Sequence, residues 1–172
     1  MRAMVIDRIR SLEHESEPLA ARTLPRPSPN GGEILIRVSA CGVCHTELDE
    51  IEGRTAPPRL PVVPGHEVVG YVEQCGPGAT RFREGQRVGV GWIHHSTGAA
   101  DENLSPHFRA TGRDVDGGYA EYMTASEAYA YPIPAVFSDA QAAPLLCAGS
   151  VGYRSQNKAD HSVLQAVTAA CH

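Results

Sequence analysis

The segment EILIRVS, residues 33–39, alternates between apolar side chains and side chains that suit a solvent-facing surface. The alternation places Ile34, Ile36 and Val38 on one face and Arg37 on the other. Successive side chains of a β-strand point to opposite faces of the sheet. The segment is therefore predicted to form a strand whose apolar face lies against a hydrophobic core.

Three further segments are rich in β-branched and apolar residues, and turns containing Gly and Pro separate them. These segments are EVVGYVEQ (67–74), QRVGVGW (86–92) and GGYAEYMT (117–124). Short strands punctuated by frequent turns are typical of a barrel or a sandwich. We therefore predict a mainly β fold for roughly the first 125 residues.

The pattern changes near Ser138. Ser138 and Gln141 have the spacing of a capping box, in which two side chains satisfy backbone groups at the start of a helix. This spacing predicts a short helical turn at residues 139–143.

Pro144 is compatible with the first turn of a helix but would break its interior. We therefore expect a C-terminal helix from about residue 144 toward residue 155, with Cys147 in its first turns. The segment HSVLQAVTAACH, residues 161–172, has the pattern of a short amphipathic helix.

The composition excludes several classes of function. The chain has 172 residues, 42% of them hydrophobic and 20% charged, which fits one soluble globular domain. A net charge of −5 provides no basic excess to neutralise phosphates, so we expect no nucleic-acid partner. No apolar run approaches the roughly 20 residues of a membrane span, and the N-terminal apolar stretch is too short for a signal peptide. We expect no membrane partner and a cytoplasmic location.

The five cysteines do not have the density or the even number of a disulfide framework. Cys41 and Cys44 form a C-x-x-C pair, which leaves a thioredoxin-like redox pair and a zinc knuckle as alternatives. The chain has no second C-x-x-C pair to complete a zinc knuckle.

An ordered series of motifs runs along most of the chain. The motifs are GVCHTEL (42–48), LPVVPGHEVVGYVEQCGPG (60–78), FREGQRVGVGW (82–92), GGYAEYM (117–123) and APLLCAG (143–149). From about Met1 to about Tyr153, the series resembles the zinc-dependent alcohol dehydrogenases of the medium-chain dehydrogenase/reductase superfamily. The resemblance implies a GroES-like barrel as the catalytic domain at residues 1–125. Residues 126–172 would form a linker and the first helix toward a Rossmann domain.

The resemblance also implies a ligand set for zinc. Cys44, His66 and Cys147 occupy the family's three ligand positions. Two thiolates and one imidazole leave one position of a tetrahedral zinc open, which is the arrangement of the catalytic zinc in alcohol dehydrogenases. Taken singly, each cysteine could instead be a buried thiol and His66 a hydrogen-bonded loop histidine.

Four neighbouring residues match other family positions. Thr46 matches the hydroxyl that accepts the proton of the alcohol near the cofactor, and His45 matches a contact to the cofactor's pyrophosphate. Glu67 follows the ligand histidine and would lie behind the metal, where it would orient the site. Trp92 matches an aromatic residue against the substrate and would favour small primary alcohols. The alternatives are a helix-capping role for Thr46, a solvated His45 and core packing for Trp92.

The chain departs from the family pattern at several positions. No cysteine lies between Cys75 and Cys147, so we expect one catalytic zinc and no structural zinc. Glu47 replaces an aspartate and is one methylene longer, which changes its reach to His66. Asp49 replaces a histidine at the end of the proton relay and is a poorer base at neutral pH, since the ordinary pKa values are about 3.9 and about 6.5. Val151 stands where relatives often carry threonine near the nicotinamide.

The chain contains no G-x-G-x-x-G turn, so we expect the Rossmann domain to be absent and the chain to be truncated. The expected function is oxidation of a small primary alcohol to an aldehyde by hydride transfer to NAD or NADP, weak or lost in the isolated chain. One alternative is a non-enzymatic zinc-binding or interaction module that can form a homo-oligomer through exposed apolar surface. Another is a zinc-free relative resembling quinone reductases, which the three ligand positions disfavour.

Overall fold

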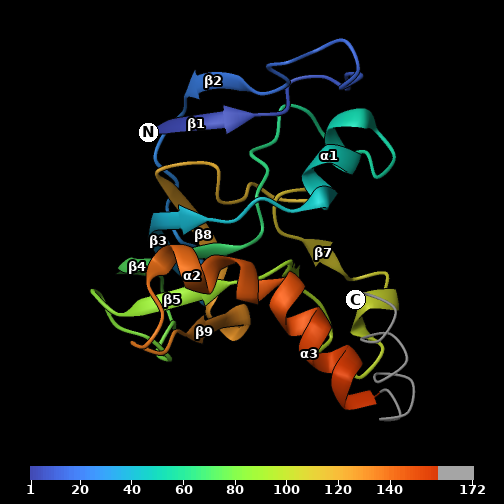
Figure 1. The fold of residues 1–172 in the computed structure, drawn as a ribbon. Helices are drawn as coiled ribbons and strands as arrows, with labels where there is room; N and C mark the ends of the chain where they lie inside the picture. The colour runs from blue at the N-terminus through green and yellow to red at the C-terminus, as the bar shows by residue number, and fades with distance from the viewer. Residues whose placement is uncertain (159–172) are drawn as a thin grey trace.

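The computed structural model describes residues 1–158 and contains a five-stranded antiparallel sheet (Figure 1). The order of the strands in this sheet is β8-β3-β4-β5-β9. Their bounds are β3 Glu33–Cys41, β4 Val68–Cys75, β5 Arg87–Val90, β8 Tyr122–Ser126 and β9 Ala130–Pro132. The mainly β class predicted from the sequence is confirmed. The segment 161–172, with its expected amphipathic helix, lies outside the described residues.

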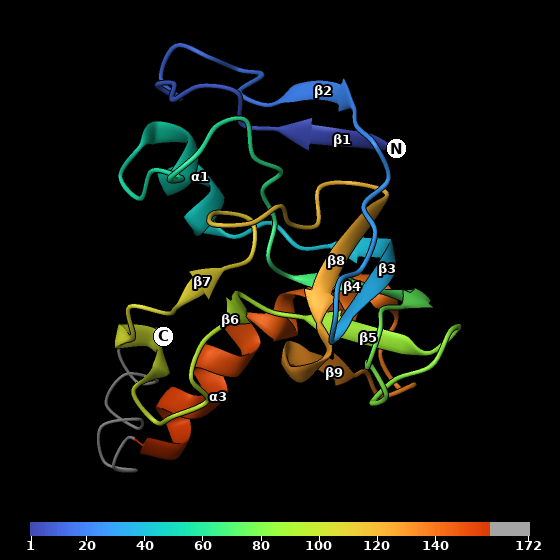
Figure 2. The ribbon, with the colours of Figure 1, turned by 180° about the vertical axis from the view of Figure 1, so that it is seen from behind.

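The sheet curls into a half-barrel around a hydrophobic core (Figure 2). Ile34 and Ile36 of β3 are fully buried in this core, as their alternation predicted. Leu35 is also buried, with 1% of its surface exposed, so both faces of β3 are covered at this point. The β3–β4 pairing shifts register between Leu35 and Ile36 and between Val38 and Ala40. Such irregularities bend a strand and help a sheet to curl.

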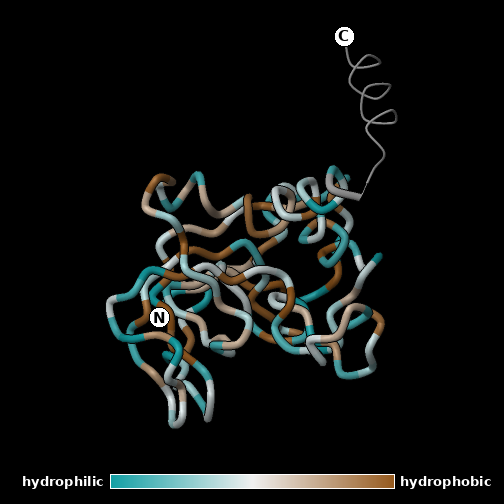
Figure 3. The backbone as a smooth tube through the Cα atoms, turned by 90° about the horizontal axis from the view of Figure 1, so that it is seen from below, coloured by the Kyte–Doolittle hydropathy of each residue, from teal (hydrophilic) through white to brown (hydrophobic). Residues whose placement is uncertain are grey.

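Two smaller hairpin-like pairs complete the β structure. β1 (Arg2–Val5) pairs with β2 (Ala20–Thr23), and β6 (Ile93–His95) pairs with β7 (Arg109–Ala110). Helix α1 (His45–Glu52) and the β1–β2 pair lie at one end of the molecule, and helix α3 lies at the other (Figures 1 and 2). Many of the hydrophobic stretches of the chain run through the middle of the molecule (Figure 3). The described helices include none with the length and apolarity needed to span a membrane.

The C-terminal part of the described chain packs on the sheet. Ser138 caps α2 (Asp139–Ala142) through the predicted capping box with Gln141. The next turn is the 3-10 helix η3 (Ala143–Leu146), and α3 spans Ala148–Lys158. Ala142 and Ala143 are buried against Val69 of β4, which joins this segment to the domain.

The expectation that Cys147 lies in the first turns of a helix is wrong. Cys147 has φ −128° and ψ −81° and interrupts the chain between η3 and α3. Pro144 at the start of η3 lacks an amide hydrogen, and the turn that contains it is a separate 3-10 unit rather than the first turn of α3. The side chain of Cys147 is therefore presented from a break between two helices.

One polar network ties α2 to the sheet. Arg87 of β5 donates from Nε to Asp139 Oδ1 at 2.7 Å and from its terminal nitrogens to the backbone oxygens of Pro134 and Phe137 at 3.2 and 2.9 Å. Ser39 of β3 donates to the other oxygen of Asp139. The Ser39 hydroxyl and the Arg87 guanidinium hold the pKa of Asp139 below its ordinary value, although partial burial opposes them.

A second network braces the lobe between β6 and β7, which also contains the 3-10 helix η1 (Glu102–Leu104). The Tyr129 hydroxyl, from the 3-10 helix η2 (Glu127–Tyr129), accepts from the Ser96 amide and donates to Glu102 Oε2, both at 3.1 Å. Ser96 donates to the backbone oxygen of Glu102 at 2.7 Å, and Glu102 Oε2 also accepts from the Gly98 amide at 3.0 Å. These hydrogen bonds tie the lobe to η2.

Replacing Asp139 with Asn is expected to lower the free energy of unfolding at pH 7 by about 1–2 kcal/mol, because one charge-assisted pair is lost. The pKa of Asp139 is lower in the folded state, so its stabilising effect is present above the unfolded-state pKa and is lost as the pH falls through the folded value. In urea unfolding between pH 7 and pH 3, the free energy of unfolding of the variant should therefore fall less steeply with decreasing pH than that of the parent. The exposed Asp101→Asn serves as control, and an identical pH dependence in the parent and D139N would contradict the assignment.

Replacing Tyr129 with Phe is expected to destabilise the lobe by about 1–2 kcal/mol, because the Ser96 amide and Glu102 lose a shared partner. Tyr131→Phe is a matched control, since the structure gives the exposed Tyr131 hydroxyl no hydrogen bond within residues 1–158. Hydrogen exchange of the Ser96 and Gly98 amides measures the effect. Equal exchange rates in both variants would show that the hydrogen bonds of Tyr129 do not stabilise the lobe.

Candidate metal centre

Four metal-ligating side chains from separate parts of the chain meet at one point. They are Cys44, His66, Glu67 and Cys147, and one ligand atom of each lies within 4.8 Å of those of the others. Cys44 immediately precedes α1, His66 and Glu67 immediately precede β4, and Cys147 lies between η3 and α3. The fold thus brings together the three sequence-predicted metal ligands and the predicted neighbouring glutamate.

Glu47 holds two members of this group in place. Its Oε2 accepts from the Cys44 backbone amide at 2.7 Å, which caps the start of α1. Its Oε1 lies 2.7 Å from Nδ1 of His66. Both side chains are almost completely buried, at 3% exposure each. The longer side chain of Glu47 therefore does reach His66, and Nε2 remains as the ring nitrogen that can bind a metal.

The electrostatics of the group follow from burial and proximity. Burial opposes a charge on His66, but the Glu47 carboxylate outweighs it and the pKa of His66 rises to about 9. Burial also opposes ionisation of Cys44, yet hydrogen bonds from Thr46 and from His66 lower the pKa of this thiol overall. Burial and the neighbouring Cys44 raise the pKa of Cys147 to about 12. A cation among these groups would favour both thiolates, because the thiolate is the metal-binding form.

Glu67 reaches the group only because Gly42 has no side chain. A Cβ atom on Gly42 would lie 1.9 Å from Oε2 of Glu67, closer than any real contact. Glu67 is 2% exposed, and burial raises the pKa of its carboxyl group. The sequence GVCH thus provides both the space for Glu67, at Gly42, and the first thiol, at Cys44.

The donor set fits zinc. Zn²⁺ prefers thiolate and imidazole ligands at about 2.0–2.3 Å, which places ligand atoms about 3.4–3.8 Å apart in a tetrahedron. The four atoms lie within 4.8 Å of one another, so only a small inward movement would complete such a set. Cys41, the other member of the C-x-x-C pair, is not part of this group, and burial raises the pKa of its thiol to about 12.

A pocket of about 300 Å³ opens beside the group. Thr46, His66 and Cys147 line one part of it, and Trp92 and Phe108 line another. The two aromatic rings pack with their centroids 5.5 Å apart. Oγ1 of Thr46 lies 3.6 Å from Sγ of Cys44. Thr46 and Trp92 therefore share a pocket with His66 and Cys147, two of the four donors.

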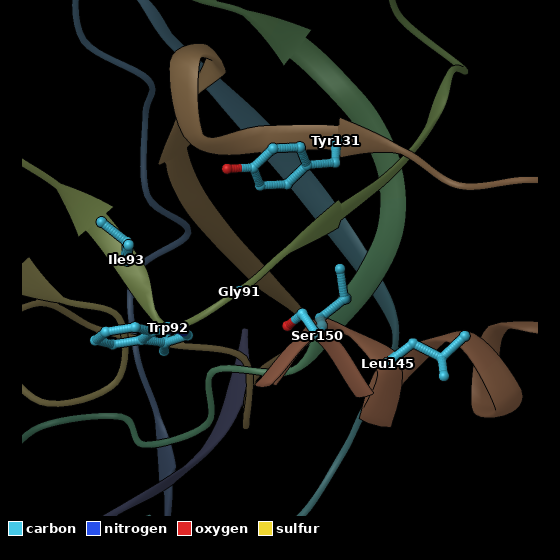
Figure 4. Close-up of a pocket in the computed structure, with 7 residues that line it drawn as sticks. Gly91, Trp92, Ile93, Tyr131, Leu145 and Ser150 are labelled. Atoms are coloured by element: carbon cyan, nitrogen blue, oxygen red, sulfur yellow. The ribbon is translucent and has the colours of Figure 1, made fainter. Parts of the chain in front are cut away.

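A second pocket of about 270 Å³ adjoins the first at Trp92 (Figure 4). Figure 4 shows Trp92 and Ile93 on one side and Leu145 and Ser150 on the other, with Tyr131 above them. Two apolar side chains that line it are exposed, Tyr131 at 47% and Leu145 at 43%, and Val151 of the first pocket is 53% exposed.

His45 and Asp49 lie outside the lining of the pocket beside the four donors. His45 is exposed, and its Nδ1 is 3.6 Å from Asp49 Oδ1. Asp49 Oδ1 also accepts from Arg54 Nε at 2.5 Å, and this contact holds the pKa of Asp49 below its ordinary value. Asp49 is therefore an even weaker base than an unpaired aspartate.

The sequence analysis missed two buried polar residues in the same pocket. Glu50 is 1% exposed and Thr111 is 2% exposed. Glu50 Oε2 and Thr111 Oγ1 have no hydrogen-bond partner among the described residues. Burial, reinforced by the Glu47 carboxylate, raises the pKa of Glu50 to about 8. Glu50 follows Thr46 by one helical turn, and this spacing could have predicted that both side chains lie on the same face of the helix. Thr111 lies in a loop, where no such spacing predicts its position.

The sequence matches the profile of the alcohol dehydrogenase GroES-like domain over residues 30–135. This match covers more than half of the chain. The chain therefore belongs to the alcohol dehydrogenase family with a GroES-like domain, within the medium-chain dehydrogenase/reductase superfamily of oxidoreductases.

Individual relatives carry the same family name. The chain is 48% identical over 143 residues to a probable alcohol dehydrogenase, AdhA, of Mycobacterium tuberculosis, covering 77% of this chain and 41% of the relative. It is 40% identical over 151 residues to an alcohol dehydrogenase of Geobacillus stearothermophilus, covering 84% and 45%. A solved NAD-dependent alcohol dehydrogenase superposes with a TM-score of 0.76 at 30% identity, covering 85% and 43%. The chain thus spans less than half the length of these relatives.

Replacing Glu47 with Leu is expected to lower the free energy of unfolding by about 1–3 kcal/mol, measured by urea unfolding in the presence of a chelator. The variant leaves the buried Cys44 amide without its acceptor and removes the carboxylate 2.7 Å from Nδ1 of His66. Glu47→Gln keeps one acceptor oxygen, so its free energy of unfolding should fall by less. An unchanged midpoint in Glu47→Leu would mean that Glu47 does not organise the group.

Proposed function

We propose that this chain carries the zinc-binding catalytic domain of an alcohol dehydrogenase that oxidises a small primary alcohol to an aldehyde with NAD or NADP. One observation carries the proposal: two thiols, one imidazole and one carboxylate converge in a site that opens into a pocket. A zinc ion bound there would act as a Lewis acid toward the oxygen of an alcohol.

Each residue of the site has a role in this proposal. Cys44, His66 and Cys147 would hold the metal, and Glu47 would orient the imidazole so that Nε2 is the ligand atom. Glu67 would lie behind the metal and orient the site, which leaves the fourth position of the zinc for the oxygen of the alcohol. One catalytic zinc per chain is proposed.

Proton transfer and cofactor contacts would begin at α1. The Thr46 hydroxyl lines the pocket beside Cys44 and would accept the proton of the alcohol. His45 is exposed at the start of α1, where a hydrogen-bond donor could contact the pyrophosphate of a dinucleotide. Asp49 would be a weak final acceptor, because Arg54 already stabilises its charged form.

The aromatic wall supports a small substrate. Trp92 and Phe108 narrow a pocket of about 300 Å³, which favours a short primary alcohol over a bulky one. We propose residues 1–125 as the catalytic domain and residues 126–172 as the linker and first helix toward a cofactor domain. A cytoplasmic location is proposed. The isolated chain is expected to be weakly active or inactive, since no G-x-G-x-x-G turn for a dinucleotide occurs in it.

A second candidate function is a non-enzymatic zinc-binding or interaction module. The exposed side chains of Tyr131 and Leu145 at the second pocket and of Val151 at the first favour this alternative, because such apolar surface invites self-association. Light scattering discriminates the two: a clean monomer that binds no apolar dye would count against the module.

Elemental analysis of the purified chain is expected to find close to one zinc per chain, and little in Cys147→Ser, because a neutral hydroxyl is a poor replacement for a thiolate. Cys75→Ser is a matched control, since Cys75 lies at the end of β4 outside the four-residue group. Equal zinc contents in Cys147→Ser and the parent would remove Cys147 from the site. No NADH from ethanol or propanol with zinc-loaded chain and NAD would refute independent activity.

A further inference from the structure

The pocket beside the four donors has a polar wall that the oxidation of a simple alcohol does not use. Glu50 Oε2 and Thr111 Oγ1 both belong to residues that line this pocket. Both side chains are at least 98% buried, at 1% and 2% exposure, and neither atom has a hydrogen-bond partner among the described residues. Buried polar atoms in native structures are nearly always paired, so two orphans in one cavity point to a bound polar group.

The charges around the pocket limit what that group can be. An anionic second group on the ligand would lie against Glu50, which lines the pocket and already has the Glu47 carboxylate as a neighbour. A second cationic group would meet the guanidinium of Arg113, which also lines the pocket. An uncharged hydroxyl avoids both repulsions and can donate to a carboxylate oxygen while accepting from a threonine hydroxyl.

We infer that this pocket selects an alcohol with a second hydroxyl group, a diol or polyol, and that Glu50 and Thr111 bind the second hydroxyl. The inference rests on the proposed function, in which the first hydroxyl lies at the metal centre. Glu50 is one helical turn from Thr46 on α1, so a single ligand in the pocket can be next to both residues. Glu50 and Thr111 act on specificity, and neither is assigned a part in the chemical step.

The chain contains a built-in probe of this pocket. Trp92 is its single tryptophan and lines the pocket, so intrinsic fluorescence reports binding without turnover. The experiment titrates 1-butanol against 1,2-, 1,3- and 1,4-butanediol, with 4-amino-1-butanol and 4-hydroxybutyrate as charged competitors. At least one diol is expected to bind roughly fivefold more tightly than 1-butanol, the effect of one added hydrogen bond.

Two near-isosteric variants test the residues. Glu50→Leu and Thr111→Val are expected to abolish the preference for the diol and to leave 1-butanol binding unchanged. Thr55→Val is the matched control, because Thr55 lines the same pocket but is exposed, and this variant should keep the preference. Because both test variants remove an unpartnered buried polar atom, they should unfold no earlier than the parent in a thermal scan.

Running the titrations with zinc-loaded and zinc-free chain separates this inference from the proposed function. A diol preference that depends on Glu50 and Thr111 supports the inference, even if the chain binds no zinc and the proposed function fails. The inference is overturned if the parent shows no preference for any diol or prefers a charged competitor. Retention of the preference in both Glu50→Leu and Thr111→Val would also overturn it.

Discussion

The candidate site depends on one buried carboxylate. Glu47 accepts from the Cys44 amide with one oxygen and contacts His66 Nδ1 with the other. It thereby joins the start of α1 to the segment that leads into β4, and it determines which nitrogen of His66 faces the thiols. Because Glu47 is buried, its carboxylate needs both of these contacts: without partners it would carry a large desolvation cost. The same side chain, Glu47, thus caps α1 and orients His66.

The curled sheet supplies the remaining geometry. Its strands bury both faces at β3, and α2 and η3 pack against β4 through Ala142 and Ala143. The Arg87–Asp139 pair anchors the same segment from the neighbouring strand. Because this segment is fixed on the sheet, the chain break at Cys147 brings its thiol to the His66 group. Because α2 and η3 are closely packed on the sheet, the sheet fixes the position of the Cys147 thiol at the site.

Local patterns predicted the parts of the structure that depend on local physics. Alternation identified the buried face of β3 at Ile34 and Ile36, and the spacing of Ser138 and Gln141 identified the start of α2. The burial of Leu35 was not predictable, because it depends on what covers the second face of the sheet. Pro144 signalled a break without locating it, since whether a 3-10 turn or an α-helix follows depends on the packing of the segment.

By itself, the sequence determined the mainly β class, the family resemblance and the identities of the candidate ligands, because strand alternation and short motifs are local properties of the chain. Only the tertiary structure decided that Glu47 reaches His66, that Glu67 occupies the space above Gly42, and that Asp49 pairs with Arg54. It also decided that Glu50 and Thr111 share a pocket. The physical reason is that distances between residues far apart in sequence are set by the packing of the whole sheet, and no local pattern encodes them.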